Sequence, residues 1–481
     1  MNFDDLKTAE AAAKLLPHVD EAAHAYANGD HWQDGRGWIG PMLESPNPLT
    51  ERATTYTERI FISEDVIGGA ISRRATGIVG RPAEWYLADG SGNQNEELNN
   101  AMTAWAKKRK LRRIVRDSIR TGCYAHAPVR LYIPPGLIGE DGTLKADSLA
   151  AALNMIELEA ADPNGAAVVT DKETGQEIGI YLFRKDNSQI AELVYINEAG
   201  QTVWRYTDER QGTELSTNGR LPMVQLDTPR LVNAAMLRNQ RKINLAATAE
   251  TENTITAGFV ARLFLNAQMP GDYERNPDGS FKTDADGRRI FKSDPMVLGG
   301  NSVNFMVGVA TTDENGTERL AAPSYMREEP SSPDTFVKSK TEARRVMLEA
   351  ASQAHVMESG DAAFSGESRL RARQEFRRDL EAIKGDVDAF IGEIIEAALS
   401  LAAAISSQPN PLEAGTAVFV DTRIDAGALT AGELTAVAGL VKDGVISHHT
   451  GLVWMGIDDA DAELAKIAKE QGSSDKTATA A

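Results

Sequence analysis

The feature that most constrains the fold is a stretch of about forty residues, 367–407, without a proline. Its apolar residues recur at three- and four-residue spacings, as on one face of an α-helix: Leu370, Phe376, Leu380, Ile383, Val387, Phe390, Ile394 and Leu399. An unbroken helix of that length reaches roughly 60 Å, and it needs packing partners to be stable. Gly385 and Gly392 lie inside the stretch and predict a kink in the helix.

The composition narrows the possible classes of protein. The chain has 51 basic and 70 acidic residues and a formal net charge of −19, whereas gripping nucleic acid by its phosphates needs clustered Lys and Arg. Its single cysteine, Cys123, excludes an internal disulfide and a site of several thiolates. The acidic start of the sequence lacks the apolar core of a secretory signal. The most hydrophobic window, Phe390 to Ile405, is shorter than a membrane span and contains Glu393 and Glu396, so we expect a buried or interface helix without membrane contact.

The N-terminal half predicts an α+β fold. Helical spacing covers residues 51–79 and 95–121. Strands are predicted from period-two alternation and turn signals at 128–134, 167–170, 178–183, 191–196 and 202–206. Eight basic residues between Lys107 and Arg120 are interleaved with a helical apolar stripe. We therefore place their charges on the outward face of an amphipathic helix, which is either solvated or faces another subunit, with a nucleic-acid patch as the alternative.

Two further helices enclose a β-rich segment. The first is predicted from Pro229 to about Thr256, and the second from Asp334 to about Met357. Between them, residues 259–333 contain several tight-turn pairs that predict short hairpins: Asp278-Gly279, Asp286-Gly287, Asn315-Gly316 and Gly299-Gly300.

The chain after the long helix predicts a strand and then a compact helical end. Residues 417–421 alternate as a strand does. Thr430 and Glu433 have the spacing of a capping box at a helix start, and Ser447 and Asp459 begin two further short helices. Residues 471–481 are polar, and we expect them to be disordered.

No motif for catalysis or cofactor binding stands out. The loop 360–368 resembles a phosphate loop before a helix, but Glu367 stands where such a loop has lysine. Residues 284–287 resemble part of a calcium loop, but Lys282 and Ser293 would be its first and last ligands, so a hairpin turn fits better. We expect no cofactor, no metal and no enzymatic activity.

A histidine pair and a row of arginines are two further candidates for binding sites. His448 and His449 are adjacent, so both cannot face one metal from a single helix. Arg369, Arg373 and Arg377 form a row on the long helix, mixed with acids. Ion pairs within or between subunits explain this row more simply than contacts with DNA.

The order of these parts resembles that of the portal proteins of tailed double-stranded-DNA phages. In that family an α+β wing, a stem helix, a β-rich clip, a second stem helix, a channel loop, a long kinked helix, a return to the wing and a helical crown follow one another. Short stretches are similar too: Tyr26–Trp32, Gly80–Pro82, Gly122 with Arg130–Pro134, Ser365-Gly366, and Gly444–Ser447 through to Glu470. The start of the long helix, Ser368–Arg373, is rich in arginine where the family has aliphatic residues.

The resemblance implies a portal-like α+β architecture. Its parts would be the wing (1–228 and the strand segment 409–426), stem helices (229–257 and 334–357), clip (258–333), channel loop (358–366), long kinked helix (367–408), crown (427–470) and disordered tail (471–481). It also implies a homo-oligomeric ring, usually of twelve subunits, at one vertex of the virion capsid and assembled in the host cytoplasm. Double-stranded DNA would pass through the channel without sequence specificity. The clip would meet the terminase large subunit and later the neck adaptor, and the wing the major capsid protein and scaffold.

The loop before the long helix is the predicted contact with DNA. It is polar and contains glycine, with Phe364 as its one large apolar residue. We predict that the following residues project into the channel: Glu358, Ser359, Gly360, Asp361, Ala362, Ala363, Phe364 and Ser365. The alternative is an ordinary connection between two helices. An acidic channel lining would let DNA slide, because phosphate-binding lysines would hold it.

Two other functions stay open from the sequence. One is a different virion structural protein of the neck or capsid. The other is a cytosolic enzyme without a recognisable motif, which a monomer with a deep pocket lined by perturbed acids would favour.

Overall fold

The structure is a computed structural model of the chain. It describes residues 8–34, 61–134, 146–258, 262–293, 307–327, 331–357 and 366–469 together with Leu6, apart from short gaps at 172–173, 209–213, 218, 269–270, 309, 313–317, 321, 323, 426, 428, 430, 456, 458–459 and 468.

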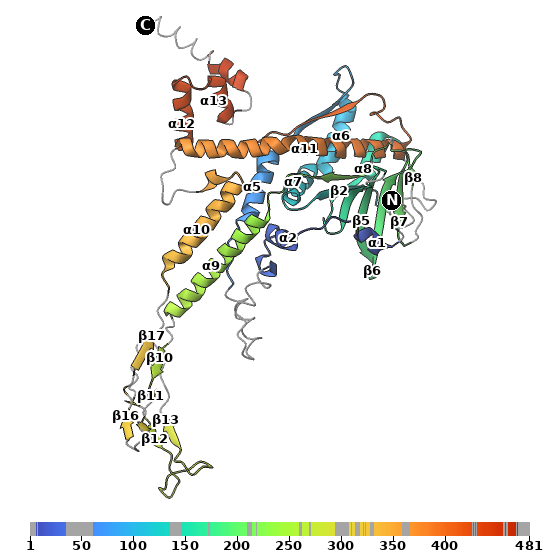
Figure 1. The fold of residues 1–481 in the computed structure, drawn as a ribbon. Coiled ribbons are helices and arrows are strands. Elements are labelled where there is room, and N and C mark those ends of the chain that lie inside the picture. The colour runs from blue at the N-terminus through green and yellow to red at the C-terminus, as the bar shows by residue number, and fades with distance from the viewer. Residues whose placement is uncertain are drawn as a thin grey trace, which may run out of the picture. The chain divides into compact units, whose positions relative to one another are not determined.

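The chain forms two compact units. Unit 1 combines Met1–Leu245 with Ser339–Ala481, and unit 2 is Ala246–Lys338. In chain order unit 2 is an insertion, because helix α9 (Ala234–Gly258) leads into it and helix α10 (Pro333–Ala350) leads back. Helices and antiparallel sheets both occur, so the predicted α+β class is confirmed (Figure 1).

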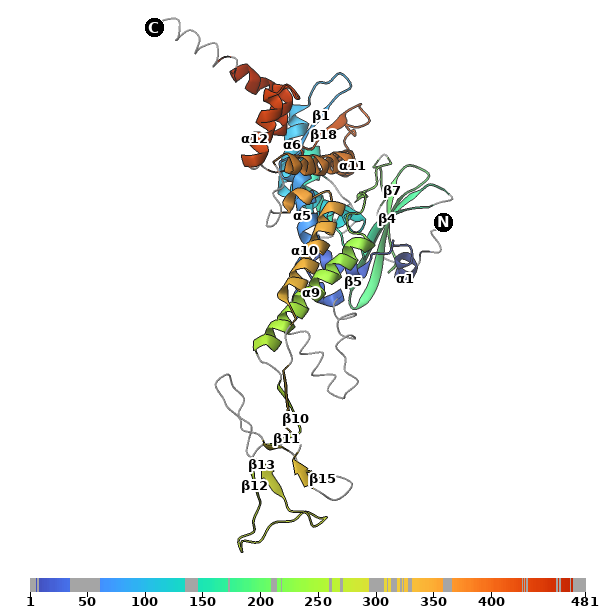
Figure 2. The ribbon, with the colours of Figure 1, turned by 60° about the vertical axis from the view of Figure 1, so that its left-hand side comes forward.

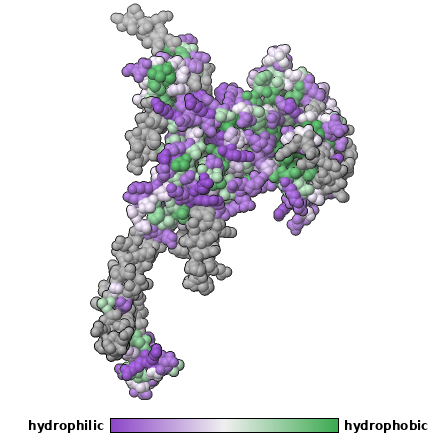
Figure 3. All heavy atoms as spheres, in the orientation of Figure 1, coloured by the Kyte–Doolittle hydropathy of each residue, from purple (hydrophilic) through white to green (hydrophobic). Residues whose placement is uncertain are grey.

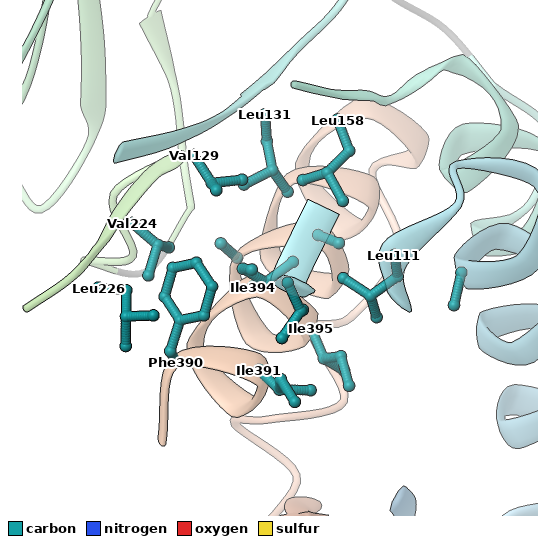
Figure 4. Packing of buried hydrophobic residues seen from close by; sticks show 14 of the residues in the cluster. Leu111, Val129, Leu131, Leu158, Val224, Leu226, Phe390, Ile391, Ile394 and Ile395 are labelled. Atoms are coloured by element: carbon teal, nitrogen blue, oxygen red, sulfur yellow. The ribbon is translucent and has the colours of Figure 1, made fainter. Parts of the chain in front are cut away.

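Helix α11 (Gly366–Ser406) forms the centre of the main core of unit 1. The apolar residues that predicted the helix are all buried. Figure 4 shows Phe390, Ile394 and their helix neighbours pointing toward side chains of three strands and of helix α7. Fully burying each such side chain contributes about 1.5–3 kcal/mol to stability. This packing against the core stabilises the long helix.

Helix α11 is continuous through Gly385 and Gly392, and Figure 1 draws it as one rod. The kink at these two residues stays a prediction. By length and composition alone, Leu370–Ser406 could cross a membrane, unlike the shorter window Phe390–Ile405. However, 72% of its most apolar window is buried inside the fold, as in the core helix of a globular protein.

A three-stranded antiparallel sheet packs against α11. Its order is β3 (Glu157–Ala160), β2 (Ala127–Tyr132) and β9 (Met223–Leu226). Helix α8 (Leu149–Met155) precedes β3 and also contacts α11. Strand β2 pairs with β3, about thirty residues later in the chain, and with β9, almost a hundred residues later. The local pattern of the sequence therefore could not predict the register of this sheet.

A five-stranded antiparallel meander forms the second sheet of unit 1, seen in Figure 2 with helix α1 (Ala9–Ala13) against it. Its strands are β4 (Ala166–Thr170), β5 (Glu177–Lys185), β6 (Ser188–Ile196), β7 (Thr202–Tyr206) and β8 (Glu214–Leu215). The predicted strands and hairpin pairings of this region are confirmed.

A two-stranded ribbon joins distant parts of the chain. Strand β1 (Glu84–Ala88) pairs antiparallel with β18 (Ala417–Asp421), which has the predicted bounds. Its inner face lies on α11, and its outer face carries Tyr86 and Phe419, whose rings stack at 5.1 Å.

Two predicted helices of the N-terminal half differ from the observed ones. Helix α5 covers Ile67–Val79, residues 61–66 are not helical, and residues 51–60 lie outside the described residues. The single helix predicted over 95–121 is two helices, α6 (Glu96–Lys108) and α7 (Leu111–Gly122). Lys110 separates them with a left-handed φ of 55°, a conformation that cannot continue a right-handed helix.

The helices beside unit 2 also shift at their ends. Helix α9 begins after Asn233, whose side-chain oxygen accepts from the amides of Ala235 and Met236, and not at Pro229. Helix α10 ends at Ala350, where the prediction continued to Met357. Ser352 has a φ of 56°, and a 3-10 turn, η3 (Ala354–Val356), follows.

The C-terminal part of unit 1 is helical. It contains α12 (Ala431–Lys442) and α13 (His448–Trp454), and residues 460–467 are also helical. Ser447 caps α13 by accepting from the amide of Thr450, as predicted. Helix α2 (Glu21–Ala27) lies at the other end of the chain and packs in a second core with α5, α9 and α10. Thr430 and Asp459 lie outside the described residues.

Unit 2 consists of paired short strands between the two helices. The antiparallel pairs are β10 (Arg262–Leu265) with β17 (Ser324–Arg327), β11 (Ala267–Gln268) with β14 (Val307–Gly308), β12 (Gly271–Tyr273) with β13 (Phe291–Ser293), and β15 (Ala310–Thr312) with β16 (Glu318–Leu320). The predicted β-rich segment is therefore confirmed. Gly279 and Gly287 have φ near 80°, as their turns require.

Candidate functional site

The predicted channel loop, Glu358–Ser365, lies outside the described residues. The structure does describe where the chain leaves the helices on either side of the loop. We define the loop root as Arg73 of α5, Gln353 and His355 after α10, and Arg373 and Phe376 of α11. These five residues come from three segments, and Arg73 of α5 lies 280 positions before Gln353.

Gln353 fixes the chain where it leaves α10. Its side chain is fully buried. The amide Nε2 donates to the carbonyl of Ala70 at 2.9 Å, and Oε1 accepts from Nε of Arg73 at 2.7 Å. Both ends of one side chain thus attach the loop root to α5, so this attachment has a fixed geometry.

His355 packs on the long helix. Its ring lies 5.1 Å from that of Phe376. Burial, together with the positive charges of Arg373 and Arg73, lowers the pKa of His355 to about 4. The imidazole is therefore neutral at pH 7 and behaves as part of the apolar packing.

The loop root carries positive charge in an acidic chain. Burial lowers the pKa of Arg73, and the neighbouring guanidinium of Arg344 adds to this effect. The nearby carboxylate of Asp65 partly offsets this effect.

Arg373 connects the start of α11 to α12. Its guanidinium donates to both carboxylate oxygens of Glu433 at 2.9 and 3.2 Å, and Glu433 is only 1% exposed. Arg377 pairs with Glu381 along the helix at 3.0 Å. The predicted preference for ion pairs in this arginine row is confirmed for these two residues, while the side chain of Arg369 lies outside the described residues.

A polar cleft of about 660 Å³ lies along the same helix. Basic residues Arg377, Lys384 and Arg423 line it together with Trp454 and the carboxylate of Asp425. Because basic, acidic and apolar side chains alternate around it, the cleft offers no focused chemistry for one ligand class. Figure 3 shows an apolar patch over α12 and mainly hydrophilic side chains along the start of α11.

A second cleft, of about 400 Å³, carries carboxylates. Arg220 pairs with Glu396 at 2.8 Å. Burial raises the pKa of Glu393, and the charges of Glu177 and Glu396 raise it further. Among the described residues that line this cleft there is no histidine or cysteine to act with Glu393. The carboxylates therefore do not form a recognisable acid–base constellation.

The bases of α9 and α10 are anchored in unit 1 by polar contacts that the sequence analysis did not find. Arg241 of α9 donates both nitrogens to Asp34 at 2.8 and 2.6 Å, and Tyr26 donates to the same carboxylate at 2.5 Å. Lys340 of α10 pairs with Glu64 at 2.8 Å. These partners are separated by two hundred residues or more in most cases, so spacing along the chain gave no signal.

Buried amides on α9 reinforce that anchor. Gln240 is fully buried, accepts from the amides of Val66 and Ile67, and donates to the carbonyl of Glu64. Asn244, one turn further, contacts the buried ring of His31 at 3.1 Å. The sequence could have indicated this anchor, because Gln240 and Asn244 are amides on an otherwise apolar helix face. Polar groups that are buried need specific hydrogen-bond partners.

The described residues hold no group of three or more His, Cys, Asp or Glu placed to bind a metal. Asp284 accepts hydrogen bonds from the amides of Asp286 and Arg288 in a hairpin turn, so the predicted hairpin turn is confirmed. His449 lies 3.6 Å from Asp461. Burial raises the pKa of Cys123 to about 11, so this thiol is not reactive.

Comparison with known proteins does not assign the chain to a family. No protein-family model matches the chain, and no curated protein matches it significantly.

Proposed function

We propose that this protein is a structural subunit of a phage portal ring, through which double-stranded DNA is packaged and ejected. In this proposal the ring sits at one capsid vertex, and it docks the terminase large subunit and later the neck adaptor through unit 2. The chain itself carries out no catalysis. The major capsid protein and scaffold would contact unit 1.

The observation that carries the proposal is the position of unit 2 within the chain. A separate β-rich unit, Ala246–Lys338, is inserted between two helices of an α+β unit. The next elements are a 41-residue helix and a strand that returns to β1. This sequence of parts is the one that the portal resemblance implies, and it is hard to account for in a single-core enzyme.

The anchoring of the two helices supports the same function. A stem that transmits force between unit 2 and a ring needs rigid attachment at its base. The base of α9 is held by the Arg241–Asp34–Tyr26 group and by Gln240, and α10 by Lys340. The second core of unit 1 buries apolar residues from both helices.

The loop root fits a loop that must act while its ends stay fixed. Gln353 attaches one end to α5, and α11, which begins at the other end, is tied to α12 by the Arg373–Glu433 pair. The net charge of −19 agrees with a channel past which DNA moves without being held.

Imaging of the purified full chain by negative-stain electron microscopy tests the proposal. Rings with a central hole are expected, and class averages should give their subunit number. Mass measurement in solution should give a multiple of 52.0 kDa. A homogeneous monomer across a wide range of protein concentration and salt would rule out the ring.

Two alternative functions predict different experimental outcomes. A neck or capsid-associated protein would form a ring that fails to bind terminase, which pull-down with purified terminase large subunit separates from the portal. An enzyme would draw on the cleft with Glu393, whose raised pKa is the single observation in its favour. Loss of a measurable hydrolytic activity in Glu393→Gln would be its signature.

A further inference from the structure

Helices α6 and α7 carry an unusual concentration of positive charge. Residues 107–120 hold eight of the 51 basic residues and only one of the 70 acidic ones. Six of these basic residues are exposed, and we call them the α6–α7 patch: Lys107, Lys108, Lys110, Arg112, Arg113 and Arg116. In a chain with a net charge of −19, such a surface is an exception that needs a reason.

Part of the positive charge in this segment serves the fold. Arg109 pairs with Glu157, Arg112 donates to the carbonyl of Val79 at the end of α5, and Arg120 donates to Ser72. The most exposed members are different. Arg113 and Arg116 share the single carboxylate Asp117, each at 3.5 Å, and their side chains remain 66% and 50% exposed.

An apolar cavity of about 210 Å³ opens within the patch. Its walls are mainly apolar, and Trp85, Ala106, Leu111 and Val115 are among the residues that line it. Lys107 and Arg112 also line it. The volume suits one aromatic or large aliphatic side chain. A partner that fits this surface therefore places an apolar side chain in the cavity and carboxylates beside it.

The chain itself presents that chemistry elsewhere on unit 1. The outer face of the β1–β18 ribbon carries Tyr86 and Phe419, which are 40% and 45% exposed. Glu84 and Asp421, with side chains 61% and 62% exposed, lie opposite each other in the register, next to the two rings. Within the chain they form surface ion pairs with Arg423 and Lys384, and exposed pairs of this kind exchange partners at little cost. Stacked aromatic rings with a pair of carboxylates on one side of them complement an apolar cavity that Lys107 and Arg112 line.

We propose that the α6–α7 patch and its cavity bind the acidic, aromatic outer face of the β1–β18 ribbon of a second copy of this chain. The contact joins two different surfaces, so it is heterologous and can be repeated around a ring. It rests on the proposed ring function, and it names the surfaces that join neighbouring subunits. Exposed cations on the patch steer association, and the cavity supplies the desolvated centre of the contact.

Charge reversal tests the cationic half of the contact. The double substitution Arg113→Glu/Arg116→Glu is expected to weaken self-association at least tenfold, measured by analytical ultracentrifugation of the full chain. The matched control is Arg184→Glu/Lys185→Glu, which makes the same charge change at the exposed end of β5 where it pairs with the start of β6. The control should associate as the wild type does.

A reciprocal substitution tests the identity of the occupant. Asp421→Lys should weaken association alone, and a mixture of Asp421→Lys chains with Arg113→Glu/Arg116→Glu chains should recover hetero-association. Cavity filling tests the apolar half. Thr103→Trp, at an exposed position that lines the cavity, should weaken association without adding salt sensitivity. Ala104→Trp, exposed on the same helix but not lining the cavity, is its control.

The outcomes separate this inference from the proposed function. If the wild type forms no ring, the proposed function fails. If the wild type forms rings and the patch variants form them equally well, only the assignment of the contact is wrong. Rings that persist while binding to purified major capsid protein is lost would assign the patch to that protein and overturn the proposal. Circular dichroism of each variant must match the wild type for these comparisons to hold.

Discussion

Gln353 uses both ends of its amide where the chain leaves α10. It is fully buried, and its partners are the carbonyl of Ala70 and the guanidinium of Arg73. A buried group that loses its partner costs more free energy than the hydrogen bond itself contributes. The position therefore controls how firmly the loop root is attached to α5.

Replacing Gln353 with leucine should lower the free energy of unfolding by about 2–3 kcal/mol, because Ala70 and Arg73 would each lose a partner. Chemical denaturation of the full chain measures this. The exposed Gln189 gives a control, and Gln189→Leu should change the stability by less than about 0.5 kcal/mol. Equal changes in stability at both positions would contradict the proposed role of Gln353 in attaching the loop root to α5.

The Arg373–Glu433 pair should behave as a buried ion pair. Arg373→Met alone removes the two-point ion pair from the buried carboxylate of Glu433 and should cost about 3–5 kcal/mol. The double substitution Arg373→Met/Glu433→Leu should recover most of that loss, since two apolar side chains can replace such a pair. A double-mutant cycle by thermal denaturation measures the coupling, and purely additive effects would contradict it.

His355 should make stability depend on pH in the acidic range. Its folded pKa of about 4 lies below the unfolded value of about 6.5. Between these values the unfolded chain binds the extra proton, so the stabilisation is complete above pH 6.5 and is lost as the pH falls toward 4. His355→Gln should flatten this part of the unfolding free-energy profile, which denaturant titration at a series of pH values measures. An unchanged profile would contradict a buried, neutral His355.

At the scale of elements, the glycines of α11 and α5 have opposite surroundings. A Cβ at Gly385 would meet nothing within 4 Å, and one at Gly392 only Val420 at 3.9 Å. A Cβ at Gly77 of α5 would lie 2.6 Å from the buried Leu380 of α11. Glycine permits close helix packing at the third position but is not required sterically at the first two.

Alanine at Gly385 or Gly392 should therefore raise the free energy of unfolding of the subunit by up to about 1 kcal/mol, through helix propensity. Gly77→Ala should lower it by about 1–3 kcal/mol through the clash. Denaturant titration ranks the three variants. If alanine stabilises the subunit but prevents ring formation, the predicted kink belongs to the assembled state. Destabilisation at Gly385 would contradict a straight helix at that residue.

Local pattern predicted some elements well and failed on others for identifiable reasons. The buried face of α11 and the bounds of β18 follow from their periodicity, because each element buries one face against the core. The break at Lys110 was missed because the apolar stripe continues across it from α6 into α7. The spacing of Glu433 after Thr430 predicted a capping box, which stays a prediction because Thr430 lies outside the described residues. The structure shows the carboxylate of Glu433 bound to Arg373, sixty residues away.

The residues of the candidate site were the least accessible to sequence reasoning. The predicted loop residues Glu358–Ser365 lie outside the described part of the chain. The loop root depends on Arg73 and Gln353, which are separated by 280 positions. Neither residue belongs to a motif, and their meeting is a product of how α5 and α10 pack. Only the tertiary fold brings such pairs together.

At the scale of the whole molecule, the two units should be separable. All three apolar clusters of the described chain lie outside Ala246–Lys338. The segments at the two ends of unit 2 come together at Asn253 and Ser331, which form two hydrogen bonds of 3.0 and 2.7 Å with each other. A short linker could therefore replace the segment between these residues without stretching the chain.

Replacing residues 256–328 with a glycine-serine linker should leave unit 1 folded, with a melting temperature close to that of its transition in the full chain. Differential scanning calorimetry measures this, and the transition of unit 2 should disappear. Binding to terminase should also be lost under the proposed function, while self-association through unit 1 should persist. A cooperative loss of both transitions would show that the units stabilise each other.

The pairing of β1 with β18 has a consequence for synthesis of the chain. The two strands are roughly 330 residues apart, which takes on the order of tens of seconds to translate at usual rates. Until α11 and β18 leave the ribosome, β1 has no partner strand and the apolar faces of β2, β9 and α7 stay uncovered. An incomplete chain is therefore unable to reach the native fold and is prone to aggregate. The synthesis of α11 and β18 therefore sets the time at which subunits can begin to associate, because only chains that contain them present the surfaces through which copies associate.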